Sequence, residues 1–155
     1  MIAKETVRRM LQQGVRGNSA HPDPLAIFDG VTWEMAGRTT TIYAHTIWQI
    51  AHHMHYWAQL KIILFQGGAV VLPSDDHFPS DPAPATPEIW EAFIHKYQDN
   101  LRTMETLLEV IELERRYPIW NDLTAAEMVM MMINHNSYHT AQIVAMRRAL
   151  GIWKV

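Results

Sequence analysis

The sequence predicts an all-α fold, a four-helix bundle that forms a single domain over residues 1–155. Three long segments carry apolar residues at helical spacing, and a broken helical segment precedes them. No segment shows the alternation of apolar and polar residues that is typical of a strand. The chain has 155 residues, of which 48% are hydrophobic, so it is long and apolar enough to bury one core.

The N-terminal part of the chain predicts two shorter helices. Residues 2–13 form an amphipathic pattern that ends at a glycine. The stretch NSAHPDP at 18–24 then has the composition of a turn. Residues 25–36 predict a second helical piece, because the next residue, Gly37, ends the pattern.

Two long helices are predicted over residues 44–66 and 87–114. The segment between them, 67–86, starts with two glycines and is rich in proline, so it forms a loop of about 20 residues. A helix of about 22 residues spans roughly 33 Å, and about 20 extended residues could retrace that length. We therefore expect the loop to cross along the bundle and the two helices to run in the same direction.

The last long helix is predicted to begin after Thr124 and to run to Leu150. Thr124 and Glu127 have the spacing of a capping box, in which each residue satisfies a backbone N–H group of the other. Gly151 suits the position that follows a helix, where a left-handed backbone conformation is common.

Composition excludes several classes of function. The net charge is −3 and the basic residues form no stripe, which disfavours a nucleic-acid partner. No stretch of 18 apolar residues predicts a membrane span, and the N-terminus lacks the features of a secretory signal, so we expect a cytoplasmic protein. With no cysteine and nine histidines, any metal ligands must be His, Asp or Glu.

Two histidines near the end of the chain, His135 and His139, are spaced four residues apart and therefore lie on one face of the last helix. On a helical wheel both fall in the middle of the apolar stripe, beside Met128 and Met146. Buried polar side chains need partners. From this helix alone, two interpretations stay open: a pair of hydrogen-bonded core histidines, or part of a metal site.

A third ligand is expected from the helix at 44–66, which contains His45, His52, His53 and His55. His53 lies nearest the apolar stripe of this helix, whereas the other three lie away from the stripe centre. Three imidazoles from two helices suit a divalent transition metal and leave a coordination position open for water or substrate.

The segments HTIWQIAHHMHYWAQLKIILFQG at 45–67 and HNSYHTAQIVAMRRALGIW at 135–153 resemble the DinB/YfiT superfamily of metal-binding helical bundles. The first is similar to a pattern of His, Ile-Trp, a ligand His eight residues after the first, then Trp and Gly. The second resembles a His-x-x-Tyr-His-x-x-Gln-Ile run that ends in Arg-Leu-Gly-x-Trp. The ligands carried over by the resemblance are His53, His135 and His139. Ala141 stands where the family usually has glycine.

The resemblance implies an up-down-down-up four-helix bundle, often a homodimer, with a bound ion of zinc or nickel; manganese and iron are also compatible. Characterised relatives include S-transferases that use low-molecular-weight thiols such as bacillithiol or mycothiol, and a mycothiol-dependent maleylpyruvate isomerase. We therefore predict a metal-dependent transferase or isomerase that acts on a small molecule with such a thiol.

Three alternatives stay open beside this function. The protein could be a non-catalytic metal- or ligand-binding module, a hydrolase that uses metal-bound water, or a metal-free bundle with satisfied core histidines. The sequence shows no obvious inward-facing carboxylate to act as a general base, which weakens the hydrolase interpretation.

Three further residues are candidates for supporting roles. His21 lies in the turn NSAHPDP and is interpreted either as a turn residue or as an acid/base group at the rim of the site. Gln142 and Tyr138 are candidate hydrogen-bond partners of the ligand histidines, because such histidines usually donate their other N–H group to a fixed acceptor.

Overall fold

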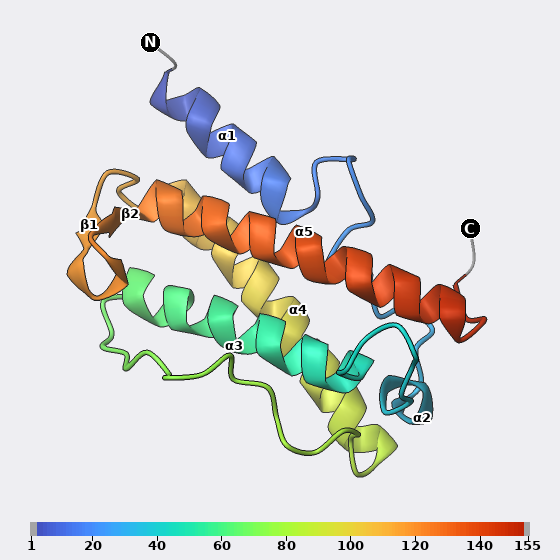
Figure 1. The fold of residues 1–155 in the computed structure, drawn as a ribbon. Helices are drawn as coiled ribbons and strands as arrows, with labels where there is room; N and C mark the ends of the chain where they lie inside the picture. The colour runs from blue at the N-terminus through green and yellow to red at the C-terminus, as the bar shows by residue number, and fades with distance from the viewer. Residues whose placement is uncertain (1–2, 154–155) are drawn as a thin grey trace.

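The computed structural model describes residues 3–153, and these residues are mostly helical, which confirms the all-α prediction. The long helices are α1 (Lys4–Val15), α3 (Ile47–Phe65), α4 (Pro87–Val110) and α5 (Ala125–Ala149), and α2 (Trp33–Ala36) is a single turn (Figure 1). Two short strands, β1 (Arg116–Tyr117) and β2 (Leu123–Thr124), flank a 3₁₀ turn at Pro118–Trp120.

The helix predicted over 25–36 is wrong for most of its length. Residues 24–30 form turns, and only Trp33–Ala36 is helical. Gly30 has a φ of +75°, which a helix does not allow, and the side chain of Thr32 begins α2 by accepting a hydrogen bond from Met35. The apolar residues of the segment, such as Ile27, are buried from these turns, so their spacing reflects burial without a helix.

The other predicted helices differ from the structure at their ends. The helix predicted from residue 44 begins at Ile47, because Thr46 and Gln49 form a capping box that fixes its start. The helix predicted to residue 114 ends at Val110. Thr124 and Glu127 form the predicted capping box at the start of α5. The predicted first helix included Ile2, which lies outside the described residues.

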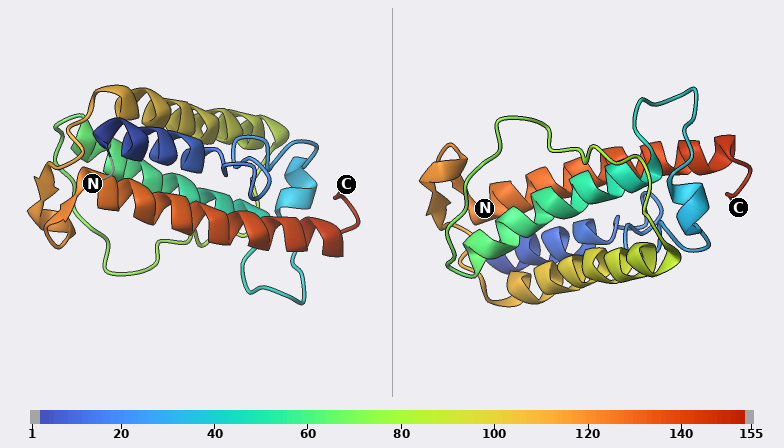
Figure 2. Two further views of the ribbon diagram at one scale, coloured as in Figure 1. Left: turned by 90° about the horizontal axis from the view of Figure 1, so that it is seen from above. Right: turned by 90° about the horizontal axis from the view of Figure 1, so that it is seen from below.

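Helices α3 and α4 lie side by side and run in the same direction. Trp48 packs against Trp90 with ring centroids 6.1 Å apart, and further along, Asn100 Nδ2 lies 2.9 Å from His55 Nδ1. In Figure 2 the colours of both helices advance from the end of the bundle near α2 to the opposite end. This arrangement requires the connecting segment to return from the end of α3 to the start of α4.

The connecting segment does so in contact with α3 (Figure 1). Three of its backbone carbonyls accept hydrogen bonds from side chains of α3 and its cap, and the residue numbers of the acceptors fall as those of α3 rise. The pairs are Asp76 with His53, Pro79 with Gln49, and Pro82 with Thr46. These hydrogen bonds hold the proline-rich segment, residues 67–86, along α3, and we call this segment the strap. Its backbone carbonyls lie against the side chains of α3.

Helix α1 lies against α4 with the opposite relation. Lys4 forms an ion pair with Glu112, just beyond the end of α4, whereas Arg16, just beyond the end of α1, pairs with Glu105. Residue numbers therefore rise along α1 as they fall along α4. Figure 2 shows α5 beside α1 and α3, so that α3 and α5 face each other across one seam of the bundle.

A short hairpin joins α4 to α5 and was not expected from the sequence. Strands β1 and β2 pair antiparallel, with Arg116 opposite Thr124. Asn121 and Asp122 make the turn with positive φ angles, which these residue types tolerate better than most. The hairpin buries Trp120, and it delivers Thr124 directly to the start of α5.

The core between the helices is rich in methionine. Met54, Met104, Met128, Met132 and Met146 are all buried, as expected for a flexible side chain that fills irregular gaps. Within residues 3–153, no helix combines the length and the apolar character needed to cross a membrane.

Candidate metal centre

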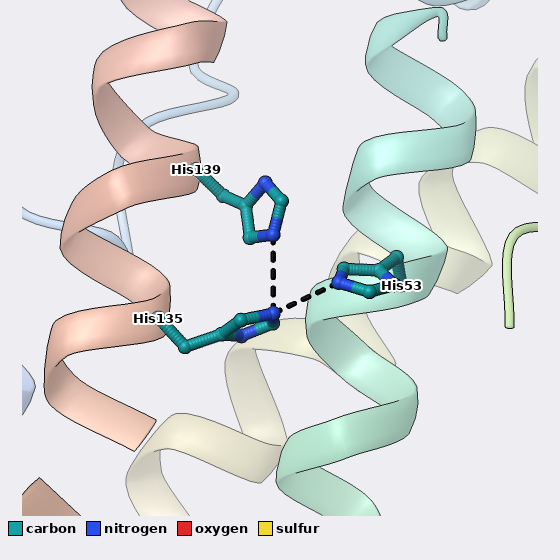
Figure 3. A group of neighbouring side chains, drawn as sticks. All are labelled: His53, His135 and His139. Atoms are coloured by element: carbon teal, nitrogen blue, oxygen red, sulfur yellow. Dashed lines mark hydrogen bonds between the residues drawn. The ribbon is translucent and has the colours of Figure 1, made fainter. Parts of the chain in front are cut away.

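Three histidines converge in the seam between α3 and α5. His53 projects from α3, and His135 and His139 project from successive turns of α5 (Figure 3). The Nε2 atom of His135 lies 2.8 Å from Nε2 of His53 and 3.1 Å from Nε2 of His139. One nitrogen from each ring lies within 4.8 Å of the others, so the three rings could hold a single metal ion.

Hydrogen bonds on the far side of two rings decide where their protons lie. His53 Nδ1 is 2.5 Å from the backbone carbonyl of Asp76, and His139 Nδ1 is 2.7 Å from Oε1 of Gln142. Both partners are acceptors, so both Nδ1 atoms carry the hydrogen of the neutral ring. The Nε2 atoms of His53 and His139 therefore present lone pairs toward His135.

The neutral imidazoles leave too few hydrogens to satisfy the converging nitrogens. His135 can supply at most one hydrogen, from Nε2, to the two lone pairs that face it. A cation bound by all three Nε2 atoms would satisfy every lone pair at once, and the oriented Nδ1–H groups are the usual support for such ligands. The residues present therefore fit a metal ion.

The proline-rich segment fixes the ring of His53. Asp75 accepts a hydrogen bond from the backbone N–H of His77, which has a positive φ of 54°, and this turn presents the carbonyl of Asp76 to His53. Phe78 stacks on His53 with ring centroids 4.2 Å apart and on His45 with centroids 3.8 Å apart. Because all three rings are nearly parallel, Phe78 lies between the two imidazoles.

Gln142 and Tyr138 lie where the sequence motif predicted partners for a histidine. Gln142 accepts from Nδ1–H of His139 and donates from Nε2 to the hydroxyl of Tyr138, over 3.1 Å. The amide is thereby oriented with its oxygen toward the histidine. Tyr138 acts on His139 only through Gln142 and by ring contact, and it is largely exposed.

Burial keeps the three imidazoles neutral. It lowers the pKa of His135 to about 3 and that of His139 to about 4, and it also lowers the pKa of His53. The positive charge of each histidine, when protonated, would further disfavour protonation of its neighbours. The neutral ring is the form that binds metal, so the site is ready for an ion at neutral pH.

The triad lies in the wall of an open pocket of about 700 Å³. Aromatic side chains from five segments of the chain make up much of the remaining wall, and the polar residues include Lys61, Gln142 and Asp76. The aromatic lining residues are Tyr43, Trp57, Phe78, Trp120 and Tyr138. A pocket of this size can hold a small organic molecule next to the histidines.

Lys61 and Asp76 are pocket residues that sequence reasoning missed. Lys61 follows His53 and Trp57 at intervals of four residues on α3, so a helical wheel places all three close to one face. That spacing was the available signal for Lys61. Asp76 lies in the proline-rich segment, where no periodic pattern shows which residues face the pocket.

The other histidines in α3 and in the residues just before it face different sides of the helix. His45 lines the pocket through its stack with Phe78. His52 stacks on Phe93 with centroids 3.9 Å apart, and His55 lies against Asn100, so both face α4 and not the triad. The selection of His53 from this cluster therefore agrees with the geometry.

His21 is placed away from the pocket. Its Nε2 lies 2.8 Å from the hydroxyl of Ser137, and its Nδ1 lies 2.8 Å from the carbonyl of Pro22. Ser137 is two residues from both His135 and His139, which puts it on the other side of α5. These contacts give no support to an acid/base role at the rim of the site, and they assign His21 to the packing of the turn against α5.

Comparison with protein families places the chain in a known group. The sequence profile of the DinB family matches residues 37–154, so the chain belongs to the DinB family. The matched range contains all three histidines of the triad and excludes α1. Comparisons with curated proteins and with solved structures gave no significant match.

The first prediction concerns metal content. Replacing His139 with alanine removes one of three ligands, so we expect the affinity for zinc to fall by at least about 100-fold, since even loss of a supporting residue costs 10–100-fold. Elemental analysis of protein purified without a metal-affinity tag measures the resulting loss of bound metal. The matched control is His95→Ala, which changes an exposed histidine of α4 and should keep full metal content. Equal metal content in both variants would contradict the assignment.

The second prediction concerns Lys61, whose pKa burial lowers from its usual value of about 10.5 to about 8. The folded protein therefore binds this proton less tightly than the unfolded chain does, and the interval corresponds to about 3 kcal/mol of instability below pH 8. The contact with the Trp120 ring offsets up to about 2 kcal/mol of this. We expect Lys61→Met to raise the free energy of unfolding of metal-free protein at pH 7 by about 1–3 kcal/mol.

The size of the effect falls with rising pH in a defined way. As pH rises from 8 to 10.5 the folded protein releases the proton first, the penalty of the wild-type lysine disappears, and the advantage of Lys61→Met shrinks. His135, whose pKa the charge of Lys61 helps to lower, is neutral throughout this range. Urea denaturation at several pH values measures the difference, with the exposed Lys96→Met as the control. A Lys61→Met protein that is less stable than wild type at pH 7 would refute this account.

Proposed function

We propose that the protein is a metal-dependent enzyme of the DinB family that holds one divalent transition-metal ion on His53, His135 and His139. The observation that carries the proposal is the convergence of three imidazole Nε2 atoms in the wall of an open pocket. Three neutral ligands leave the charge of the ion uncompensated and a coordination position free for a further ligand, as in catalytic sites.

The residues around the triad have separate roles in this proposal. The carbonyl of Asp76 and the amide of Gln142 hold the ligand rings in one tautomer and orientation. Trp57, Trp120 and Phe78 give the pocket an apolar wall, which binds the carbon skeleton of a substrate and limits the access of water.

For the reaction, we propose a transfer or isomerisation that uses a low-molecular-weight thiol. An ion in this site lowers the pKa of a thiol bound to it, so that the thiolate is available at neutral pH. The sequence contains no cysteine, so the sulfur comes from a cosubstrate. Membership of the DinB family supports this class of reaction through the resemblance to thiol-dependent relatives.

Hydrolysis is the second candidate, and one observation favours it. Asp76 is the acidic residue among those that line the pocket, and the sequence did not reveal it. A carboxylate near a metal-bound water can act as a general base. The thiol reaction ranks first because Asp76 meets the triad through its backbone carbonyl, which accepts from His53, and the residue is otherwise exposed.

Four finer properties belong to the same proposal. Zinc or nickel is the proposed ion, because imidazole ligands suit both. The proposed bundle order is up-down-down-up, supported by the contacts of α3 with α4 and of α1 with α4. A homodimer is proposed from the family resemblance, and sedimentation equilibrium tests the oligomeric state. A cytoplasmic location is proposed from the sequence features described above.

The experiment for the thiol reaction uses protein loaded with cobalt. We expect at least one low-molecular-weight thiol, from a set that includes bacillithiol and mycothiol, to produce sulfur-to-cobalt charge-transfer absorption in the wild type. The His139→Ala variant serves as the control and should give no band at the same cobalt concentration. If no thiol produces the band while the site is fully loaded, the thiol reaction is abandoned, and Asp76→Asn then tests the hydrolytic candidate.

A further inference from the structure

Lys61 is a buried cation in the wall of the pocket that holds the triad. Its side chain is only 3% exposed, yet it contributes to the pocket surface. It follows His53 by eight residues on α3, which is about 12 Å along the helix axis. The ammonium and the histidines therefore lie in one pocket, separated by a distance that a small molecule can span.

The ammonium group of Lys61 is incompletely satisfied by the protein. Nζ donates one hydrogen bond to the backbone carbonyl of Trp57 over 3.1 Å, and it lies 4.3 Å from the ring centre of Trp120. Among residues 3–153 it has no ion pair with a carboxylate. An ammonium has three N–H donors, so up to two remain for a ligand.

A buried cation without a counter-ion destabilises a protein unless something compensates its charge. A bound anion would supply the missing charge and accept the remaining hydrogen bonds, which are strong when both partners are charged. Asp76 is the acidic residue among those that line the pocket. Its backbone carbonyl accepts a hydrogen bond from His53, which precedes Trp57 on α3, whereas Lys61 follows Trp57. The pocket therefore offers positive charge at Lys61 and at the proposed ion.

The surface between the two charged points is aromatic. The Trp57 and Trp120 rings meet edge to face with centroids 6.0 Å apart, and both contact the ammonium of Lys61. Aromatic walls of this kind bind planar apolar groups well. Charge and shape together indicate a ligand with an anionic end and a planar body.

We propose that the pocket binds a small carboxylate with a planar apolar body, and that Lys61 holds the carboxylate while the body extends toward the triad. The proposal rests on the proposed function in one respect, because it takes the triad side of the pocket as the place where the ligand reacts. Lys61 is then the residue that determines specificity for an anionic substrate.

The experiment compares acids with neutral amides of the same shape. Isothermal titration calorimetry measures benzoate against benzamide, phenylacetate against phenylacetamide, and 3-phenylpropionate against 3-phenylpropanamide, in a buffer free of carboxylates and phosphate. For at least one pair we expect the wild type to bind the acid at least about tenfold more tightly, as a charged hydrogen bond predicts. In Lys61→Met the preference should fall to about one, with affinity for the amide kept.

The control variants separate this inference from the metal assignment. Lys96→Met removes an exposed lysine of α4 and should keep the preference for the acid. Metal-free protein should also keep it, because Lys61 and not the ion recognises the carboxylate, whereas His139→Ala tests the ion alone. A preference that persists in Lys61→Met, or a wild type that shows no preference or binds none of the six probes, overturns the inference whatever the metal content. A wild type that keeps the preference but binds no metal ion at the triad overturns only the proposed function.

Discussion

The Nε2 atoms of His53, His135 and His139 face one another in the seam between α3 and α5, and neutral rings cannot satisfy all of them with the hydrogens they carry. Much of the surrounding structure maintains this arrangement. The strap of residues 67–86 returns along α3 and places a backbone carbonyl behind His53, while Gln142 is held by Tyr138 behind His139. Each of these contacts orients a lone pair toward the common point, as the partners of metal-ligating histidines usually do.

The helices and the triad could be predicted because both depend on periodicity. The wheel positions of His135 and His139 on α5, and of His53 on α3, follow from where the apolar residues lie, and packing α3 against α5 then brings the three rings together. The capping box of Thr124 and Glu127 was equally visible, since it depends on residue types at fixed spacing.

Features of irregular segments, which have no periodic pattern of apolar residues, could not be predicted. The carbonyl of Asp76 is a backbone group in an irregular segment, and its direction depends on the positive φ of His77. Residues 25–30 have apolar spacing that suggested a helix, but Gly30 turns the chain. Lys61 is at helical spacing from His53, so its place on the pocket face could be predicted. It was missed because a lysine is normally assumed to be exposed, whereas Lys61 is buried.

X-ray absorption spectroscopy of the zinc-loaded protein tests the central claim, that the three converging histidines are the ligands of one ion. The account predicts a first shell at about 2.0–2.1 Å that includes three imidazoles, identified by the scattering of their outer ring atoms. In the His135→Ala protein, any remaining zinc should show fewer imidazoles. A wild-type spectrum with only carboxylate or water oxygens around zinc, or an imidazole number unchanged by His135→Ala, would contradict the account.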